Sequence, residues 1–224
     1  MKFDTRSVRG RTRKLNHDYA GALCDGDRGL FVIADGTSRQ GSGPLAECFV
    51  KGVLAASLQH VKQGVDVSEH GAVEQVLCSM LAELLHTCLF ADQTGALCYL
   101  VGFAAHGKLT LAYEGDCSCG VVTPEGRIEW ITPPHCKANW RRDRSHRELA
   151  QDPARNRITR CLKVNRAPNP DIVFHPLAVD ERLVFVTDGF WAELSESQQS
   201  SLLAKPDSDF IAVEDDVTWI DVQF

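Results

Sequence analysis

Acidic residues stand at the ends of several segments whose apolar residues predict β-strands. Five acids follow or precede such a segment: Asp18, Asp35, Asp116, Asp188 and Asp215. One aspartate before a glycine is typical of an ordinary turn, but five acids at strand ends favour a shared site. Carboxylate oxygens are hard ligands, so we expect this site to bind Mg²⁺ or Mn²⁺ and not zinc.

The hairpin predicted at 19–34 places two of these acids opposite each other. If Cys24 pairs with Gly29 across the four-residue turn, Asp18 lies opposite Asp35. Facing residues in an antiparallel pair are roughly 4.5–5.5 Å apart. Two carboxylates that close repel each other unless a proton or a cation lies between them. A divalent metal ion is the simplest cation that resolves this repulsion.

The remaining elements follow from the period of the apolar residues. Helices are predicted at 44–61 and 67–90, where apolar residues keep helical spacing, and a short helix at 195–204. Strands are predicted at 96–105, 108–114, 117–123, 127–131, 172–176, 182–187 and from 217 onward. We expect the four strands between 96 and 131 to form one antiparallel meander, and 132–160 to be irregular. The order of elements predicts an α+β fold with helices packed on antiparallel sheets.

The composition is that of an ordinary globular protein. The chain has 224 residues, 44% of them hydrophobic and 24% charged, and a net charge of −6. We therefore expect a single domain spanning 1–224, without the basic excess typical of nucleic-acid binding. No apolar run reaches about 18 residues, and the first residues lack the apolar stretch of a signal peptide. We expect a cytoplasmic monomer that does not bind membranes.

Nine cysteines are spread along the chain, mostly among apolar residues. Without an export signal, this pattern predicts reduced and mostly buried thiols. Cys117 and Cys119 form a C-x-C pair, and His135-Cys136 is the other candidate pair of ligands. The spacing of these two pairs is not that of a zinc site.

Seven segments, in order along the chain, resemble the motifs of one enzyme family. The first, GRTRKLNHD at 10–18, resembles the G-x-x-R-x-x-N-x-D opening of the metal-dependent protein phosphatases, the type 2C serine/threonine phosphatases. The others are at 31–36, 113–118, 131–135, 156–162, 186–191 and 215–218. Each match alone is weak, but seven in order are specific. The resemblance implies an α-β-β-α sandwich, in which two stacked antiparallel β-sheets are flanked by helices.

The resemblance also implies a function and a set of site residues. It implies a protein phosphatase that hydrolyses phosphoserine and phosphothreonine by direct attack of a metal-bridging hydroxide. Arg13 would bind the substrate phosphate, and Arg13 and Asp35 would be the catalytic residues. Two Mn²⁺ or Mg²⁺ ions would be held by Asp18, Asp35, the Gly36 carbonyl, Asp188 and Asp215. Its partners would be phosphorylated proteins, the substrates of a bacterial serine/threonine kinase.

Three positions depart from the family pattern. Asp116 matches a ligand of a third metal ion, but Ala192 stands where the second acid of that site is expected. A third ion would therefore bind weakly or not at all. Thr37 replaces a histidine that many members carry, and Ser118 replaces an arginine. These departures motivate an alternative, a catalytically weak or inactive relative that binds phosphoproteins as a regulatory module.

Two further alternatives concern the substrate. The same metal chemistry would serve a small phosphomonoester, because the residues on the substrate side carry the weakest pattern. The stretch 137–160 holds eight arginines and lysines. It is either a basic rim that attracts acidic phosphopeptides or a solvated loop with scattered charge.

Overall fold

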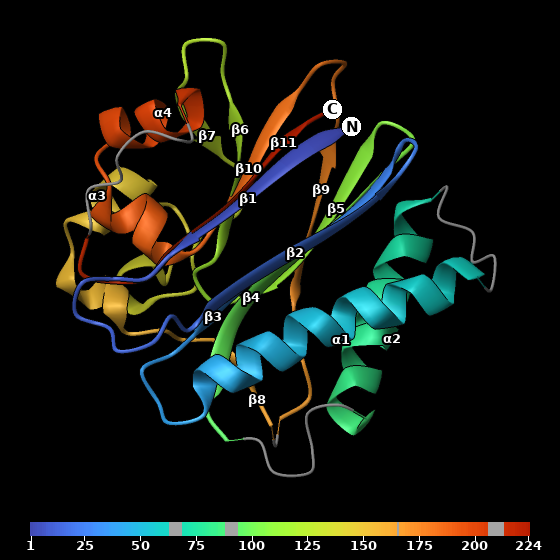
Figure 1. The fold of residues 1–224 in the computed structure, drawn as a ribbon, viewed down its shortest axis with the longest axis horizontal. Helices are drawn as coiled ribbons and strands as arrows, with labels where there is room; N and C mark the ends of the chain where they lie inside the picture. The colour runs from blue at the N-terminus through green and yellow to red at the C-terminus, as the bar shows by residue number, and fades with distance from the viewer. Residues whose placement is uncertain (63–68, 88–93, 165, 206–212) are drawn as a thin grey trace.

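The computed structural model describes residues 1–62, 69–87, 94–164, 166–205 and 213–224. Two antiparallel β-sheets lie face to face (Figure 1). The first sheet has five strands, in the order β1 (Lys2–Val8), β11 (Val217–Gln223), β10 (Arg182–Val186), β6 (Ser118–Val122) and β7 (Ile128–Trp130). The second sheet has six strands, in the order β2 (Asp18–Asp25), β3 (Arg28–Gly36), β4 (Ala96–Ala105), β5 (Lys108–Glu114) and β9 (Asp171–Pro176), with β8 (Leu162–Lys163) paired to β4.

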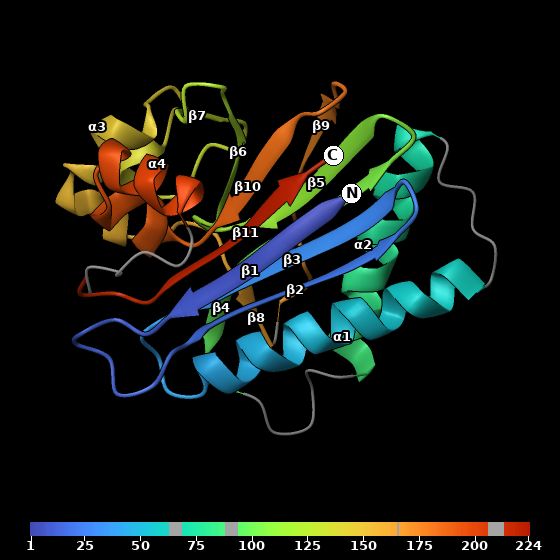
Figure 2. The same ribbon diagram turned by 45° about the horizontal axis from the view of Figure 1, so that its top comes forward.

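Helices cover the outer face of each sheet (Figure 2). On the second sheet these are α1 (Ser42–Lys62) and α2 (His70–Thr87). On the first sheet they are α3 (His146–Ala150), α4 (Glu196–Ala204) and a π-helical turn at Gly189–Glu193. Two 3₁₀ turns, η1 (Lys137–Asn139) and η2 (Pro153–Asn156), lie in the segment before β8. The expected α-β-β-α sandwich is confirmed.

Strand β3 shows how the sequence builds this core. Side chains alternate between the two faces of a strand. Leu30 and Val32 therefore pack under the helices, whereas Phe31 and Ile33 pack against the first sheet. The rings of Phe31 and Phe185 meet between the sheets, 5.2 Å apart at their centroids. A strand buried on both faces needs a continuous apolar run, and this one has it.

The predicted hairpin is confirmed, including its register. Cys24 pairs with Gly29, and Asp18 pairs with Asp35. The predicted helices and strands are found, and most strand boundaries agree within one residue. The two ends of the predicted helix 67–90, residues 67–68 and 88–90, lie outside the described residues.

The prediction of one meander over 96–131 is wrong. Strands β4 and β5 pair in the second sheet, but β6 and β7 belong to the first sheet. The chain crosses between the sheets at 115–117, where Gly115 has a φ of +112°. Alternation of apolar residues predicts a strand but does not say which strand it pairs with. The sequence pattern therefore does not distinguish this crossing from a turn of a meander.

Several further elements were not predicted, among them β1 and α3. Strand β1 pairs along its whole length with β11. Helix α3 begins at a capping box, in which Ser145 and Glu148 bond each other's backbone N–H, inside the segment expected to be irregular. None of the helices that the structure describes has the length and apolarity needed to cross a bilayer.

Candidate metal centre

The five acids predicted at strand ends gather at one end of the sandwich. Asp18 begins β2 and Asp35 lies near the end of β3, so both come from the second sheet. Asp188 follows β10 and Asp215 precedes β11 in the first sheet. Asp116 lies in the crossing between the sheets. Each sheet therefore supplies carboxylates to a shared cluster.

Asp18 is held by a hydrogen bond that joins the two sheets. Its side chain is buried, and its Oδ2 accepts a bond of 2.7 Å from the Thr187 hydroxyl. The same hydroxyl oxygen accepts from the backbone N–H of Thr218, at 3.0 Å. Burial raises the pKa of Asp18 to about 7, although the bond from Thr187 opposes this shift. The carboxyl is thus fixed in position and holds its proton unusually tightly.

The neighbouring acids raise one another's pKa. Removal from water raises the pKa of Asp35 well above its ordinary value, and the charges of Asp18 and Asp188 raise it further. Burial, and then the charge of Asp116, likewise raise the pKa of Asp188. Such a cluster is stable when protons or cations neutralise it. The carboxylates offer oxygen donors, which fit Mg²⁺ or Mn²⁺.

Asp116 gives a second observation that fits a cation. It is 3% exposed, and its Oδ1 is buried without a hydrogen-bond partner among the described residues. Burial raises its pKa to about 6. An unpaired buried acceptor costs about 1–3 kcal/mol, so a bound cation would stabilise this side chain.

Two arginines neutralise part of the cluster in the structure. Arg13 donates to Asp215 Oδ1 through Nε at 2.7 Å and Nη2 at 2.5 Å, and its Nη1 donates to Ser38 Oγ at 3.2 Å. Arg155 lies across the cluster, with Nη1 3.4 Å from Asp188 Oδ2. Arg13 was predicted as a site residue, whereas Arg155 was not singled out among the basic residues of 137–160.

The side chain of Asp216 holds the loop that carries Arg13. The two oxygens of Asp216 accept from the N–H groups of Gly10 and His17, each at 2.8 Å. The loop lies so close to β11 that a Cβ on Gly10 would be 2.3 Å from the Asp215 carbonyl carbon. The role of Asp216 was not predicted.

Two more contacts position the predicted ligands. Glu193 Oε2 accepts from the backbone N–H of Glu214 at 2.8 Å and of Asp215 at 3.1 Å. Gly36 donates its N–H to the His17 carbonyl at 3.0 Å, and a Cβ there would be 2.7 Å from the Ser42 carbonyl oxygen. Glycine is therefore required at position 36 for the chain to pass.

The positions that depart from the family pattern have structural roles here. Thr37 Oγ1 bonds Ser42 Oγ at 3.0 Å, and Ser118 Oγ bonds the buried His146 at 2.8 Å. Ala192 offers no ligand and lines a cavity of about 590 Å³ between α3 and α4. Asp116 therefore lacks the acidic partner that the family motif provides.

His135 has a structural role. Its Nδ1 accepts from the N–H of Gly115 at 3.0 Å, and its ring stacks on Tyr113 at 4.7 Å. Burial lowers its pKa to about 4, so it stays neutral at physiological pH.

Several arginines of the stretch 137–160 form ion pairs within the protein. Arg142 and Arg160 both pair with Asp171, and Arg144 pairs with Asp152. These contacts favour a folded loop over an open basic rim.

No protein-family profile matches the chain, and no curated protein sequence matches it. Solved structures do resemble it. A Staphylococcus aureus serine/threonine phosphatase has a TM-score of 0.78 at 18% identity, over 100% of this chain and 94% of the other. A Streptococcus agalactiae serine/threonine phosphatase has a TM-score of 0.76 at 17% identity, over 98% of each chain.

A third resembling structure was determined with metal ions. The catalytic domain of the serine/threonine protein phosphatase PstP, in complex with two manganese ions, has a TM-score of 0.68 at 18% identity. The match covers 98% of this chain and 96% of that domain. Over nearly its whole length, the chain therefore has the fold of these serine/threonine phosphatases.

Proposed function

We propose that this protein is a Mn²⁺- or Mg²⁺-dependent phosphatase that hydrolyses phosphoserine and phosphothreonine in proteins. The observation that carries the proposal is the cluster of carboxylates shared by the two sheets, with native pKa values raised by burial and mutual repulsion. The fold of the resembling phosphatases, one of them solved with two manganese ions, adds support. The expected partners are phosphorylated substrates of a serine/threonine kinase. We expect the protein to act on them in the cytoplasm as a monomer.

The residues that would hold the metal ions come from both sheets. Asp35 lies centrally and would contact both ions, with the Gly36 carbonyl beside it. Asp188 and Asp215 would hold the ions from the first sheet, and Asp18 would support the centre from β2. When bound, the ions would supply the positive charge that activates a water molecule and polarises the phosphoryl group.

The chain's own residues prepare this site. The Thr187 hydroxyl keeps Asp18 facing Asp35 rather than solvent. Asp216 fixes the loop that presents Arg13 at the edge of the cluster. The planar guanidinium of Arg13 can contact two phosphate oxygens at once, which orients the phosphoryl group and offsets its charge.

The proposal is tested by hydrolysis of a phosphothreonine peptide and of an aryl phosphate, with Mn²⁺, with Mg²⁺ and with a chelator. We expect turnover that requires metal and favours the peptide. Preference for small phosphate metabolites would change the substrate class. No turnover by folded protein in millimolar Mn²⁺ would contradict the proposal and favour the alternative, a regulatory module that binds phosphoproteins. Ala192 is the observation behind that alternative.

Replacing Arg13 with lysine should weaken phosphate recognition. A hydrogen bond to a charged group contributes about 1.5–3 kcal/mol, so we expect kcat/KM to fall about 10- to 100-fold. Steady-state kinetics on the phosphopeptide would measure it. The matched control is Arg11→Lys, because Arg11 is exposed and 3.4 Å from Glu214. Equal losses in both variants would assign Arg13 to folding of the loop instead.

A further inference from the structure

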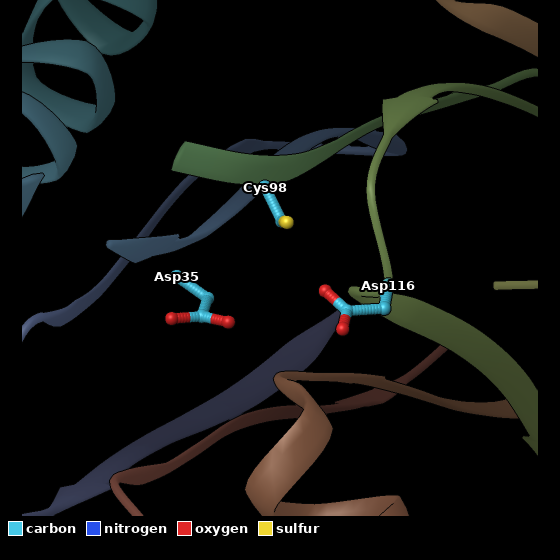
Figure 3. A group of neighbouring side chains, drawn as sticks. All are labelled: Asp35, Cys98 and Asp116. Carbon is cyan, nitrogen blue, oxygen red and sulfur yellow. The ribbon is translucent and has the colours of Figure 1, made fainter. Parts of the chain in front are cut away.

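A buried thiol lies inside the acidic cluster. Cys98 on β4 is directly paired in register with Asp35 on β3. Its Sγ, one oxygen of Asp35 and one oxygen of Asp116 all lie within 4.8 Å of one another. Figure 3 shows the thiol of Cys98 directed into the space between the two carboxylates. Three elements distant in the sequence thus bring one sulfur and two oxygens together.

The local backbone is built to allow this approach. Gly115 precedes Asp116 and has a φ of +112°, which side chains rarely adopt. A Cβ at Gly115 would be 2.3 Å from the Cβ of Cys98 and 2.4 Å from its Sγ. Only glycine therefore lets the crossing between the sheets pass against Cys98 and place Asp116 beside it.

An unsatisfied acceptor points to a ligand in this space. Asp116 Oδ1 is buried and has no hydrogen-bond partner in the described part of the chain. Cys98 itself is 1% exposed and forms no disulfide. Burial, and then the charges of Asp116 and Asp35, raise the pKa of the Cys98 thiol well above its ordinary value, so without a metal ion the thiol keeps its proton and donates it to the Asp116 carboxyl. A thiophilic ion would displace that proton and bind the sulfur together with the carboxylate oxygens.

We propose that Cys98, Asp35 and Asp116 form a binding site for a thiophilic divalent ion of the zinc class. Three protein ligands and one open position are a common arrangement around Zn²⁺. Zinc bonds of about 2.3 Å to sulfur and about 2.0–2.2 Å to oxygen need the ligand atoms closer together, so the three side chains would have to rotate toward the ion on binding. Binding converts the thiol to a thiolate and releases its proton to solvent.

The site has a consequence for the proposed phosphatase. Asp35 would serve both this site and the all-oxygen metal centre, so a zinc-class ion would exclude Mn²⁺ or Mg²⁺ from Asp35. The ion would then inhibit the enzyme. This inhibition rests on the proposed function, whereas the binding of the ion does not.

The test uses Co²⁺ as a coloured substitute for Zn²⁺, added to the full chain. Cobalt bound to a thiolate has a charge-transfer band in the near ultraviolet, which cobalt bound only to oxygen lacks. We expect the band to saturate at one Co²⁺ per chain, to disappear in Cys98→Ser, and to be displaced by Zn²⁺. It should persist in two controls, Cys24→Ser at an exposed thiol and Cys119→Ser at a buried one.

A second variant keeps the test valid if Cys98→Ser folds poorly. Asp116→Asn retains the thiol but loses a charged ligand, so Co²⁺ affinity should fall at least about 10-fold. Calorimetry in buffers of different ionisation enthalpy should show at least one proton released per ion, from the Cys98 thiol and from any carboxyl ligand that is protonated beforehand. No band in the parent protein, or a band that survives Cys98→Ser, would overturn the site. Because the band does not depend on turnover, the zinc-class site and the phosphatase can fail separately.

Discussion

Replacing Asp35 with asparagine is expected to lower kcat/KM for phosphopeptide hydrolysis by at least about 1000-fold. Asp35 is the acid that would contact both metal ions, and an asparagine oxygen carries no charge to hold them. The measurement is steady-state hydrolysis in saturating Mn²⁺. The exposed variant Asp143→Asn, which also removes one carboxylate, should keep the parent activity. Activity within 10-fold of the parent would remove Asp35 from the metal centre.

In the presence of a chelator, which removes metal ions, Asp35→Asn should have a larger free energy of unfolding than the parent protein. The native pKa of Asp35 is raised, so the native state binds this proton more tightly than the unfolded chain does. The stabilisation is complete below the ordinary pKa of about 4 and is lost as pH rises through the native pKa. Asp18, with a native pKa of about 7, behaves in the same way.

The stability advantage of Asp35→Asn should therefore grow between pH 5 and pH 8. Urea unfolding with a chelator at the two pH values would measure it. Added Mn²⁺ should stabilise the parent and reverse the order of the two proteins. If, with a chelator at pH 8, Asp35→Asn were less stable than the parent, the ionised Asp35 carboxylate would not be destabilising the native state.

Replacing Gly115 with alanine should lower the free energy of unfolding by about 3–5 kcal/mol. The new Cβ would meet Cys98 at 2.3 Å, and the backbone would keep a φ that alanine rarely adopts. Urea unfolding would measure the loss.

The matched control for this variant is Gly107→Ala. Gly107 also has a positive φ, +70°, but the nearest atom to its Cβ would be 3.9 Å away. It should therefore lose only the backbone term, about 1–2 kcal/mol. If both variants lost the same free energy of unfolding, the crossing between the sheets would accommodate the new Cβ without further destabilisation.

The features that the sequence predicted well depend on residues close together in the chain. The hairpin of β2 and β3 has a clear turn and an apolar run, so its register could be predicted, and with it the facing of Asp18 and Asp35. Helices α1 and α2 could also be predicted, because their apolar residues recur at helical spacing.

The features that were missed depend on residues far apart in the chain. Strand β1 alternates weakly and has many polar residues, and its pairing with β11 joins the two ends of the sequence. Arg155 is one of many basic residues until the fold places it beside Asp188. Cys98 looks like any cysteine in a buried strand until the crossing at Gly115 brings Asp116 against it. Nothing in the local pattern marks such neighbours.

The hydrogen bond from Thr187 to Asp18 spans the interface between the two sheets. The acids are also divided between the sheets, so a bound ion would bond to carboxylates of both and link the two layers. Sliding of one layer over the other would then have to break oxygen–metal bonds as well as slide apolar side chains past each other. The end of the sandwich that holds the acidic cluster would therefore resist mechanical shear more strongly in the metal-bound protein than in the metal-free protein.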